Sequence, residues 1–308
     1  MKKIPLLRRG AQSAGWFLPK RPIYSRLQHN RVAIVRLREN MTNYWHNKTV
    51  LVTGGSSGLG RVIAEQFAKA EAKLILVALE QDGLDQATEE MRTAGTNVTP
   101  IRANITQQED VDRIFRQVET EHGGLDALVN NAGRSMRGKV LDTTPEQFQA
   151  LFDLNVLGTI RCCRAAIPML LKRRGHIVNI GSLAAKSAAR FVGAYPVSKF
   201  AVAAYSQQLR LELGADGLHV LLVCPGPIKR ENERLYPLEG LEGIPDTARA
   251  PGAGVKVGKI DPVWLAQKIL DYCERRKPEL VVPCKARLLF ALSQLFPTLG
   301  DYLVKKNT

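Results

Sequence analysis

From Lys48 onward, short apolar runs alternate with longer stretches in which apolar residues recur every three or four positions. Short apolar runs bounded by turn residues are typical of parallel strands that are buried on both faces. The longer stretches predict amphipathic helices that connect one strand to the next. The pattern predicts strands over 49–55, 74–79, 97–103, 125–133 with its turn, 176–182, 218–226 and 279–283, and helices over 58–70, 82–94, 107–121, 145–173, 195–214 and 261–276.

This order of elements predicts an α/β protein with a doubly wound parallel sheet. In this architecture, ligands bind in a crevice beyond the carboxyl ends of the strands. The second expected strand follows the first too closely for another domain to lie between them. We therefore predict a single globular domain over residues 46–283.

Two segments depart from the regular pattern. Residues 227–260 are rich in Gly and Pro, and a connection this long in a compact domain is usually functional, so we expect a substrate lid. Residues 284–308 contain two short apolar helical stretches that are broken at Pro297. Apolar residues nearly encircle 288–296, which favours packing over the crevice or against a second subunit. The alternative is peripheral contact of this tail with an anionic membrane surface.

Residues 1–45 form a basic extension. Ten of the 44 Lys and Arg residues, but only one of the 29 acidic residues, lie in residues 1–40, so this segment carries +9 of the net charge of +15. It shows no strand or helix periodicity, and we expect it to be disordered. Three interpretations are open: an arm that contacts anionic surfaces, a targeting peptide, and an upstream stretch that precedes an initiator at Met41. The third is favoured because regular structure begins directly after Met41.

Composition narrows the class of protein. With 45% hydrophobic and 24% charged residues the chain is globular, and no run approaches the roughly 20 apolar residues of a membrane span. The five cysteines form no CxxC pair and no His–Cys cluster, which predicts no metal site and a cytoplasmic protein with reduced thiols. The five histidines lie far apart, and we expect structural or surface roles for them. Because the excess positive charge lies in the extension, no specific nucleic-acid partner is expected.

The first chemical signal is the glycine-rich sequence TGGSSGLG at Thr53–Gly60, which ends the first expected strand and opens a helix. Glycines at 54, 58 and 60 let the backbone approach a pyrophosphate closely. The helix N-terminus adds unpaired N–H groups and a positive dipole end. The spacing is GxxxGxG rather than the common GxGxxG. We therefore predict a turn that binds a dinucleotide.

The second signal pairs a phenol with an ammonium group. Tyr195 and Lys199 lie four residues apart, on one face of a helix. A nearby cation favours the phenolate, which makes the tyrosine a workable acid or base near neutral pH. The same spacing occurs elsewhere in the chain, but only Tyr195 follows a strand that carries a hydroxyl, Ser182, at its carboxyl end. This hydroxyl can hold a substrate carbonyl beside the phenol.

Together these motifs resemble the short-chain dehydrogenase/reductase family. The resemblance covers about residues 46–283 and implies a Rossmann-type fold. It also implies hydride transfer between a nicotinamide dinucleotide, NAD or NADP, and an alcohol or a carbonyl compound. The matching residues, in the family's order, are TGGSSGLG at 53–60, NNAG at 130–133, Asn155, Ser182, Tyr195 with Lys199, and PG at 225–226.

The resemblance further implies roles for individual residues. Tyr195 would be the general acid/base, and Lys199 would lower its pKa and hold the nicotinamide ribose. Ser182 would orient the substrate oxygen, and Asn155 would anchor a water-linked proton relay. The residues implied to bind the cofactor are Thr53, Gly54, Ser56, Ser57, Gly58, Leu59, Gly60, Leu79, Asn104, Ile105, Asn131, Ala132, Gly133, Tyr195, Lys199, Pro225, Gly226 and Ile228.

Departures from the family pattern leave the choice of cofactor open. Ala78 and Leu79 stand where the family usually has an acid for the NAD ribose or a cation for the 2′-phosphate of NADP. Glu80 follows them and slightly favours NAD, whereas Arg61 could favour NADP by reaching the phosphate. Asn104 replaces the aspartate that is usual near the adenine.

The implied partners are a small, hydrophobic alcohol or ketone and further copies of the chain. The resemblance predicts a homodimer or homotetramer built on the helices at 145–173 and 195–214. The competing hypothesis is a catalytically idle scaffold that binds a dinucleotide and acts through a partner. The presence of both Tyr195 and Lys199 argues against this hypothesis.

Overall fold

The computed structural model describes residues 44–230, 242–249, 252 and 257–307. These residues belong to a compact unit that extends from Met41 to Thr308. The predictions for residues 1–43, and for the undescribed parts of the expected lid at 227–260, lie outside the described residues.

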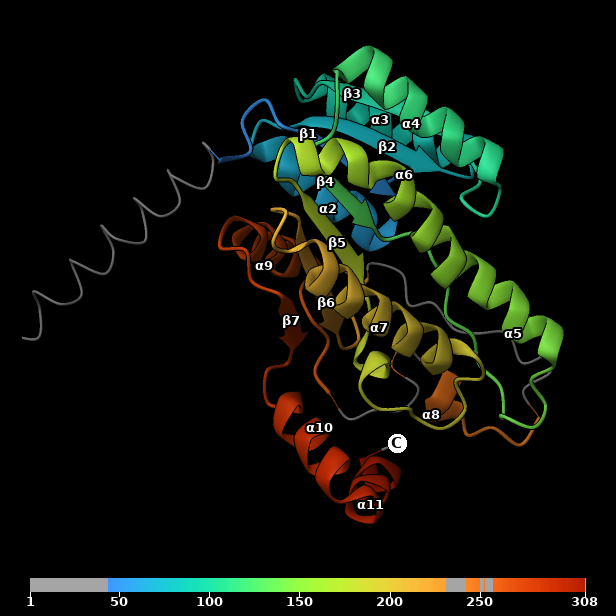
Figure 1. The fold of residues 1–308 in the computed structure, drawn as a ribbon. Helices are drawn as coiled ribbons and strands as arrows, with labels where there is room; N and C mark the ends of the chain where they lie inside the picture. The colour runs from blue at the N-terminus through green and yellow to red at the C-terminus, as the bar shows by residue number, and fades with distance from the viewer. Residues whose placement is uncertain (1–43, 231–241, 250–251, 253–256, 308) are drawn as a thin grey trace, which may run out of the picture. The chain divides into compact units, whose positions relative to one another are not determined.

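The described strands form one parallel sheet in the order β3-β2-β1-β4-β5-β6-β7 (Figure 1). The chain runs outward from β1 to β3, then crosses back to β4 and runs outward to β7. The order thus reverses between β1 and β4, and a doubly wound sheet binds its ligand at the carboxyl ends of such a pair. The strands are β1 Thr49–Thr53, β2 Lys73–Ala78, β3 Val98–Arg102, β4 Ala127–Asn130, β5 His176–Ile180, β6 His219–Pro225 and β7 Glu279–Val282.

Helices cover both faces of this sheet, as the α/β pattern predicts. Helices α2, α3 and α9 contribute to the hydrophobic core on one face, and α4, α6 and α7 contribute to the core on the other. The fold class predicted from the sequence is confirmed. The helices are α2 Gly58–Lys69, α3 Gln81–Thr93, α4 Gln108–His122, α5 Pro145–Phe152, α6 Gly158–Lys172, α7 Tyr195–Leu213, α8 Asp246–Arg249, α9 Pro262–Glu274, α10 Ala286–Leu295 and α11 Pro297–Asn307.

The burial of β1 explains why the strands are continuous apolar runs. Val50 and Val52 pack into the core formed with α2, α3 and α9. Leu51 points to the opposite face and packs into the core formed with α4 and α6. Because successive residues of a strand alternate between faces, a sheet covered on both sides needs apolar side chains at every position.

The single helix expected over 145–173 is interrupted, which corrects that prediction. A π-helical segment, Asp153–Leu157, separates α5 from α6. The combined stretch Pro145–Lys172 is long and apolar enough to cross a membrane by length and composition alone, and half of its most apolar part is buried within the fold. Cys162 and Cys163 of α6 are completely buried in the core. This stretch therefore serves as a core helix here.

Trp45 belongs to the folded domain, although the sequence pattern placed it in the extension. Its indole is completely buried and contacts the rings of Tyr44 and Phe67 edge to face, with centroids 4.9 and 4.8 Å apart. The ring packs in the core that also contains α2 and α9. The domain therefore includes Tyr44 and Trp45, ahead of the expected boundary at residue 46.

We expect Trp45→Ala to lower the free energy of unfolding by about 3–5 kcal/mol, because it leaves a cavity in the core. Trp264→Ala is the matched control, since that indole is 43% exposed on α9 and its loss should cost less than about 1 kcal/mol. Chemical denaturation of both variants measures the difference. Equal losses would show that Trp45 contributes no more than a surface side chain.

Candidate functional site

The glycine-rich sequence forms the turn between β1 and α2. Gly54 and Gly58 have φ angles of +62° and +53°, which L side chains rarely adopt. The space next to Gly58 is open, because a Cβ there would meet no atom within 4 Å. The side chain of Ser57, the N-cap residue of α2, does not accept a hydrogen bond from the first N–H groups of this helix. Open space beside a positive helix end is what a pyrophosphate requires.

A second turn, which follows β4, braces the glycine-rich turn. The amide of Asn131 donates hydrogen bonds to the carbonyl oxygens of Thr53 and Gly54, at 3.2 and 3.1 Å. The Thr53 hydroxyl accepts from the backbone N–H groups of Asn131 and Ala132, both at 3.1 Å. A Cβ on Gly60 would collide with the Gly54 carbonyl and the Asn131 amide. Only glycine at position 60 therefore lets the two turns pack this closely.

A cavity of about 750 Å³ lies at these turns. Thr53, Gly60 and Asn155 are buried and do not line it, so they support the wall from behind. All of the other predicted site residues come together in its lining, namely Gly54, Ser56, Ser57, Gly58, Leu59, Leu79, Asn104, Ile105, Asn131, Ala132, Gly133, Ser182, Tyr195, Lys199, Pro225, Gly226 and Ile228.

A phenol, an ammonium and a hydroxyl all belong to this lining. Tyr195 opens α7, and the Nζ atom of Lys199 lies 5.8 Å from the centroid of the Tyr195 ring. Ser182 lies two residues beyond the end of β5, and its Oγ accepts a hydrogen bond from the N–H of Ala184 at 3.1 Å. That bond fixes the short 3-10 turn that begins at Leu183. The cavity thus contains a phenol, an ammonium and a hydroxyl, which are groups able to bind an oxygen atom and exchange a proton with it.

The Lys199 ammonium is buried at the base of this group. Only 7% of the residue is exposed, and Nζ donates a hydrogen bond to the carbonyl oxygen of Ile180 at 2.7 Å. Burial lowers the pKa of Lys199 from its ordinary 10.5 to about 8, so the group is still mainly protonated at pH 7. Because solvent screens this charge only weakly, its interaction with neighbouring groups is stronger than that of an exposed lysine.

Asn155 connects two parts of the site from behind the cavity wall. It lies in the π-helical segment, a kind of element that often marks functional sites. Its amide nitrogen donates to the carbonyl of Arg134 at 2.9 Å and to the hydroxyl of Ser198 at 3.0 Å. The Ser198 hydroxyl donates in turn to the carbonyl of Tyr195 at 2.7 Å. Asn155 thus joins the turn after β4 to the start of α7, and acts on Tyr195 by positioning it.

The expected adenosine end of the cavity carries a carboxylate. Leu79 and Glu80 line it, and Asn104 lies beside them with its Oδ1 accepting from the N–H and hydroxyl of Thr106, at 3.1 and 2.9 Å. Arg61 does not line the cavity. Its guanidinium instead pairs with Glu65 at 3.1 Å and with Glu90.

The sequence analysis missed several residues of the lining. Arg134 directly follows the NNAG motif, and this adjacency was the signal that could have identified it. Leu289 and Phe290 of α10 and Val304 of α11 also line the cavity, as packing of the tail over the crevice predicts. The sequence shows that the tail is apolar, but it does not show which of its apolar side chains face the cavity. That depends on how the two helices are oriented against the domain.

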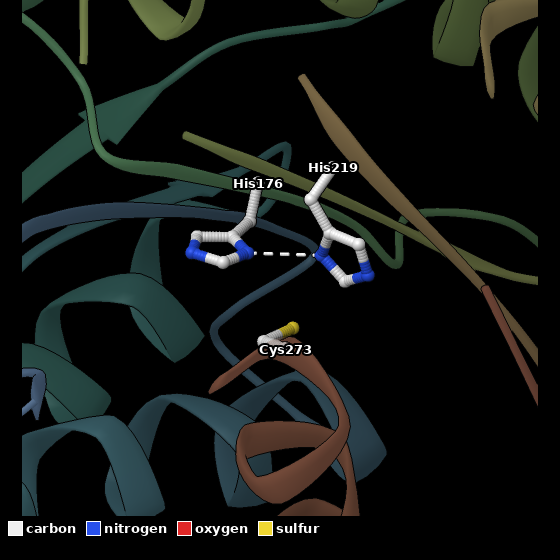
Figure 2. A group of neighbouring side chains, drawn as sticks. All are labelled: His176, His219 and Cys273. Carbon is white, nitrogen blue, oxygen red and sulfur yellow. Dashed lines mark hydrogen bonds between the residues drawn. The ribbon is translucent and has the colours of Figure 1, made fainter. Parts of the chain in front are cut away.

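Two histidines that lie far apart in the sequence form a pair at the opposite, amino-terminal edge of the sheet, next to Cys273 (Figure 2). The expectation that the chain has no His–Cys cluster is therefore wrong, because the fold brings these distant residues together. Nδ1 of His176 lies 2.9 Å from Nδ1 of His219, although the residues are 43 positions apart. His219 Nε2 lies 2.9 Å from the carbonyl oxygen of Lys277, which can only accept, so this nitrogen donates. Burial lowers the pKa of His176 to about 2 and that of His219 to about 4, so both rings are neutral at pH 7.

Neutrality fixes the direction of the whole chain of hydrogen bonds. With Nε2 of His219 protonated, its Nδ1 accepts from His176 Nδ1, and His176 Nε2 then accepts from the Tyr44 hydroxyl at 2.6 Å. Cys273 lies beside the pair, and its ligand atom and those of the two histidines are within 4.8 Å of one another. All four ring nitrogens are nevertheless already partnered. This cluster is therefore explained as a structural link between residue 44, β5 and β6.

Comparison with known proteins adds three findings. Residues 48–236 match the family described as short chain dehydrogenase. The probable oxidoreductase EphD of Mycobacterium tuberculosis is 31% identical over 263 residues, which cover 82% of this chain but only 44% of the mycobacterial protein. The ketoacyl reductase HetN of a Nostoc species is 29% identical over 262 residues, covering 84% of this chain and 88% of HetN.

The fold also resembles that of solved short-chain dehydrogenases. A crystal structure of a short chain dehydrogenase/reductase from Burkholderia phymatum, in complex with NAD, superposes with a TM-score of 0.73 at 24% sequence identity. The match covers 83% of this chain and 95% of that one. At this identity the superposition shows a shared fold.

We expect Lys199→Met to stabilise the protein by about 1–3 kcal/mol at pH 7, because it removes the cost of burying a charge. The native pKa near 8 lies below the ordinary 10.5, so this cost is fully present below pH 8 and disappears as the pH rises toward 10.5. The advantage of the variant should shrink over that interval. Chemical denaturation at pH 7 and at pH 10 measures it, and a variant less stable than the wild type at pH 7 would contradict the prediction.

Proposed function

The chain belongs to the short-chain dehydrogenase family, and on that premise we propose that it is an oxidoreductase that interconverts an alcohol and a carbonyl compound with NAD or NADP. One observation carries the proposal. Tyr195, Lys199 and Ser182 line the same cavity as the glycine-rich turn, so a proton donor and a pyrophosphate site share one space. The chain spans less than half the length of EphD, so its activity is inferred from this site and not from that protein.

The residues fit the cofactor that the family implies. The turn at Gly54–Gly58 would hold the pyrophosphate, Asn131, Ala132 and Gly133 would border the adenosine half, and Lys199 would hold the nicotinamide ribose. Other residues of the cavity lining, among them Pro225, Gly226 and Ile228, would enclose the rest of the cofactor. When bound, the cofactor supplies or accepts the hydride at the substrate carbon.

The protein's own groups then manage the oxygen atom and its proton. The Ser182 hydroxyl orients the substrate oxygen beside the Tyr195 phenol. In reduction Tyr195 donates its proton to that oxygen, and in oxidation the phenolate removes the proton from the alcohol. The buried Lys199 charge stabilises the phenolate in both directions. Asn155 keeps the start of α7 in place through Ser198, which donates to the backbone carbonyl of Tyr195. The family resemblance further implies that Asn155 would anchor a water-linked relay that returns the proton.

The idle-scaffold hypothesis finds no support in this arrangement. A protein that only bound a dinucleotide could use the Lys199 ammonium for the nicotinamide ribose, but it would have no use for a phenol beside that ammonium, whose burial costs stability. Here the ammonium lies next to the one phenol that the cavity exposes beside a hydroxyl among the described residues. The cost is explained if Tyr195 works as an acid and base.

The apolar side chains of the cavity and of α7 support a proposal for the substrate class and for the assembly. Leu183, Val192, Leu289 and Phe290 line the cavity, which suits a hydrophobic alcohol or ketone. The exposed Val197 and Phe200 on α7 are apolar surface of the kind that a homodimer or homotetramer would cover. All five cysteines are free and four of them are buried, which suits a reducing, cytoplasmic environment.

We expect Tyr195→Phe to lower kcat by about 10²–10⁴-fold while leaving the dissociation constant of the cofactor almost unchanged, because only the proton donor is lost. Tyr302→Phe is the matched control, since Tyr302 has a lysine at the same spacing but is 60% exposed on α11. Steady-state turnover and cofactor fluorescence titration give the two quantities. Near-normal turnover in Tyr195→Phe would refute the assigned mechanism.

We expect a higher kcat/KM with NAD than with NADP, because Glu80 lines the cavity and repels a 2′-phosphate while Arg61 is paired with Glu65 and Glu90. Glu80→Gln should reduce the preference, whereas Glu89→Gln, a change on the same helix outside the cavity lining, should leave it unaltered. A tenfold preference of the wild type for NADP, worth about 1.4 kcal/mol, would show that this charge argument is wrong.

A further inference from the structure

Helix α10 is apolar on two opposite sides. Leu289 and Phe290 line the cavity, and Phe290 also packs against the core cluster that contains Val202 and Val281. Leu288 and Leu295, which lie two helical turns apart on another face, are 68% and 71% exposed. A helix at the surface of a soluble protein normally turns charged and polar residues to the solvent. On α10, Arg287 and Gln294 are exposed in this way, but Leu288 and Leu295 are exposed beside them and form an apolar strip on the solvent side.

The same surface continues onto the next helix. Phe296, at the junction of α10 and α11, is 57% exposed, and Leu299 and Tyr302 of α11 are 45% and 60% exposed. The two helices pack against each other and form a hairpin beyond β7 (Figure 1). We call this set of side chains, Leu288, Leu295, Phe296, Leu299 and Tyr302, the outer face of the tail.

Basic residues outnumber acidic ones around the outer face. Lys285 precedes α10, and Lys305 and Lys306 lie in the last turn of α11. All three are exposed, and in the part of the chain that the structure describes none of them forms an ion pair. Asp301 is the acidic residue between them in the tail. An apolar face bordered by lysines matches a surface of apolar chains beneath anionic headgroups.

The dimensions allow contact with a bilayer but not a crossing of it. Helix α10 has 10 residues and is thus about 15 Å long, half of the hydrocarbon thickness. The loop after β4 adds apolar side chains at the same carboxyl edge of the sheet, since Val140 and Leu141 are 70% and 94% exposed. The edge that carries the cavity is therefore also the edge that carries the exposed apolar residues of the tail.

We propose that the outer face of the tail docks on an anionic lipid surface, and that the substrate is a long-chain alcohol or ketone dissolved in that lipid. The inner face of the same helices forms part of the cavity wall, so a lipid-dissolved chain enters beneath α10 without crossing water. The identity of the reacting group rests on the proposed function. The docking surface rests only on the exposed side chains and lysines.

The test uses the full-length protein and phosphatidylcholine vesicles with and without phosphatidylglycerol. The outer-face variant is Leu288→Gln/Leu295→Gln/Leu299→Gln, none of which lines the cavity. Leu211→Gln is the matched control, because Leu211 is 76% exposed near the end of α7, at the opposite edge of the sheet. The basic residues 1–40 are present in all three proteins, so their attraction to vesicles is constant. Circular dichroism and turnover of a short, water-soluble ketone confirm that each variant is folded.

We expect the wild type and the control to sediment with the anionic vesicles, and the outer-face variant to bind them at least tenfold more weakly. The kcat/KM for a long-chain ketone presented in these vesicles should fall by a similar factor in the outer-face variant. The value for the short ketone should not change, because the cavity is intact.

Three results would overturn the proposal in distinct ways. Equal vesicle binding by the wild type and the outer-face variant would show that the tail does not dock. A second possible result is that the wild type fails to bind vesicles and forms an oligomer that the outer-face variant does not form. Sedimentation velocity would detect this result, which would assign the surface to a second copy of the chain. If the wild type turned over neither ketone, the proposed function and the named substrate would fall together, while vesicle binding would still decide the docking surface.

Discussion

The contact between the turns that follow β1 and β4 determines where everything else in the site can lie. Asn131 donates to two carbonyls of the glycine-rich turn, and the Thr53 hydroxyl accepts from two N–H groups of the opposite turn. This exchange fits only because Gly60 has no Cβ. The turn after β4 then holds Asn155 through Arg134, and Asn155 holds the start of α7 through Ser198. These hydrogen bonds thus link the glycine-rich turn to the start of α7, where Tyr195 lies.

The site is assembled at a cost in stability. Lys199 is an ammonium at 7% exposure whose partner among the described residues is a neutral carbonyl oxygen, and burial lowers its pKa to about 8. The large apolar cores on the two faces of the sheet stabilise the fold and offset the free-energy cost of burying this charge. At the other edge of the sheet, the buried rings of Trp45, His176 and His219 are neutral, and the Asp126 carboxylate is paired with Arg173. Lys199 has no carboxylate partner of this kind among the described residues.

The sheet, its helices and most of the cavity lining could be predicted from the sequence because they depend on local patterns. A continuous apolar run indicates a strand covered on both sides, and the glycine spacing indicates a turn near phosphate. Features that depend on contacts between distant residues could not be predicted. The pairing of His176 with His219 needs the register of β5 and β6, and the pairing of Arg61 with Glu90 needs the packing of α2 beside α3. The π-helical segment at Asn155 has no periodicity signal of its own, because its flanks are ordinary helix.

The central claim, that this cavity transfers hydride between a nicotinamide and a carbonyl carbon, is tested most directly by isotope transfer. The protein is incubated with a ketone and reduced cofactor carrying deuterium at both positions of nicotinamide C4, and the alcohol is examined by mass spectrometry. The account predicts one deuterium on the carbinol carbon for each cofactor oxidised. Oxidation of the cofactor without deuterium in the alcohol, or with no alcohol formed, would contradict it.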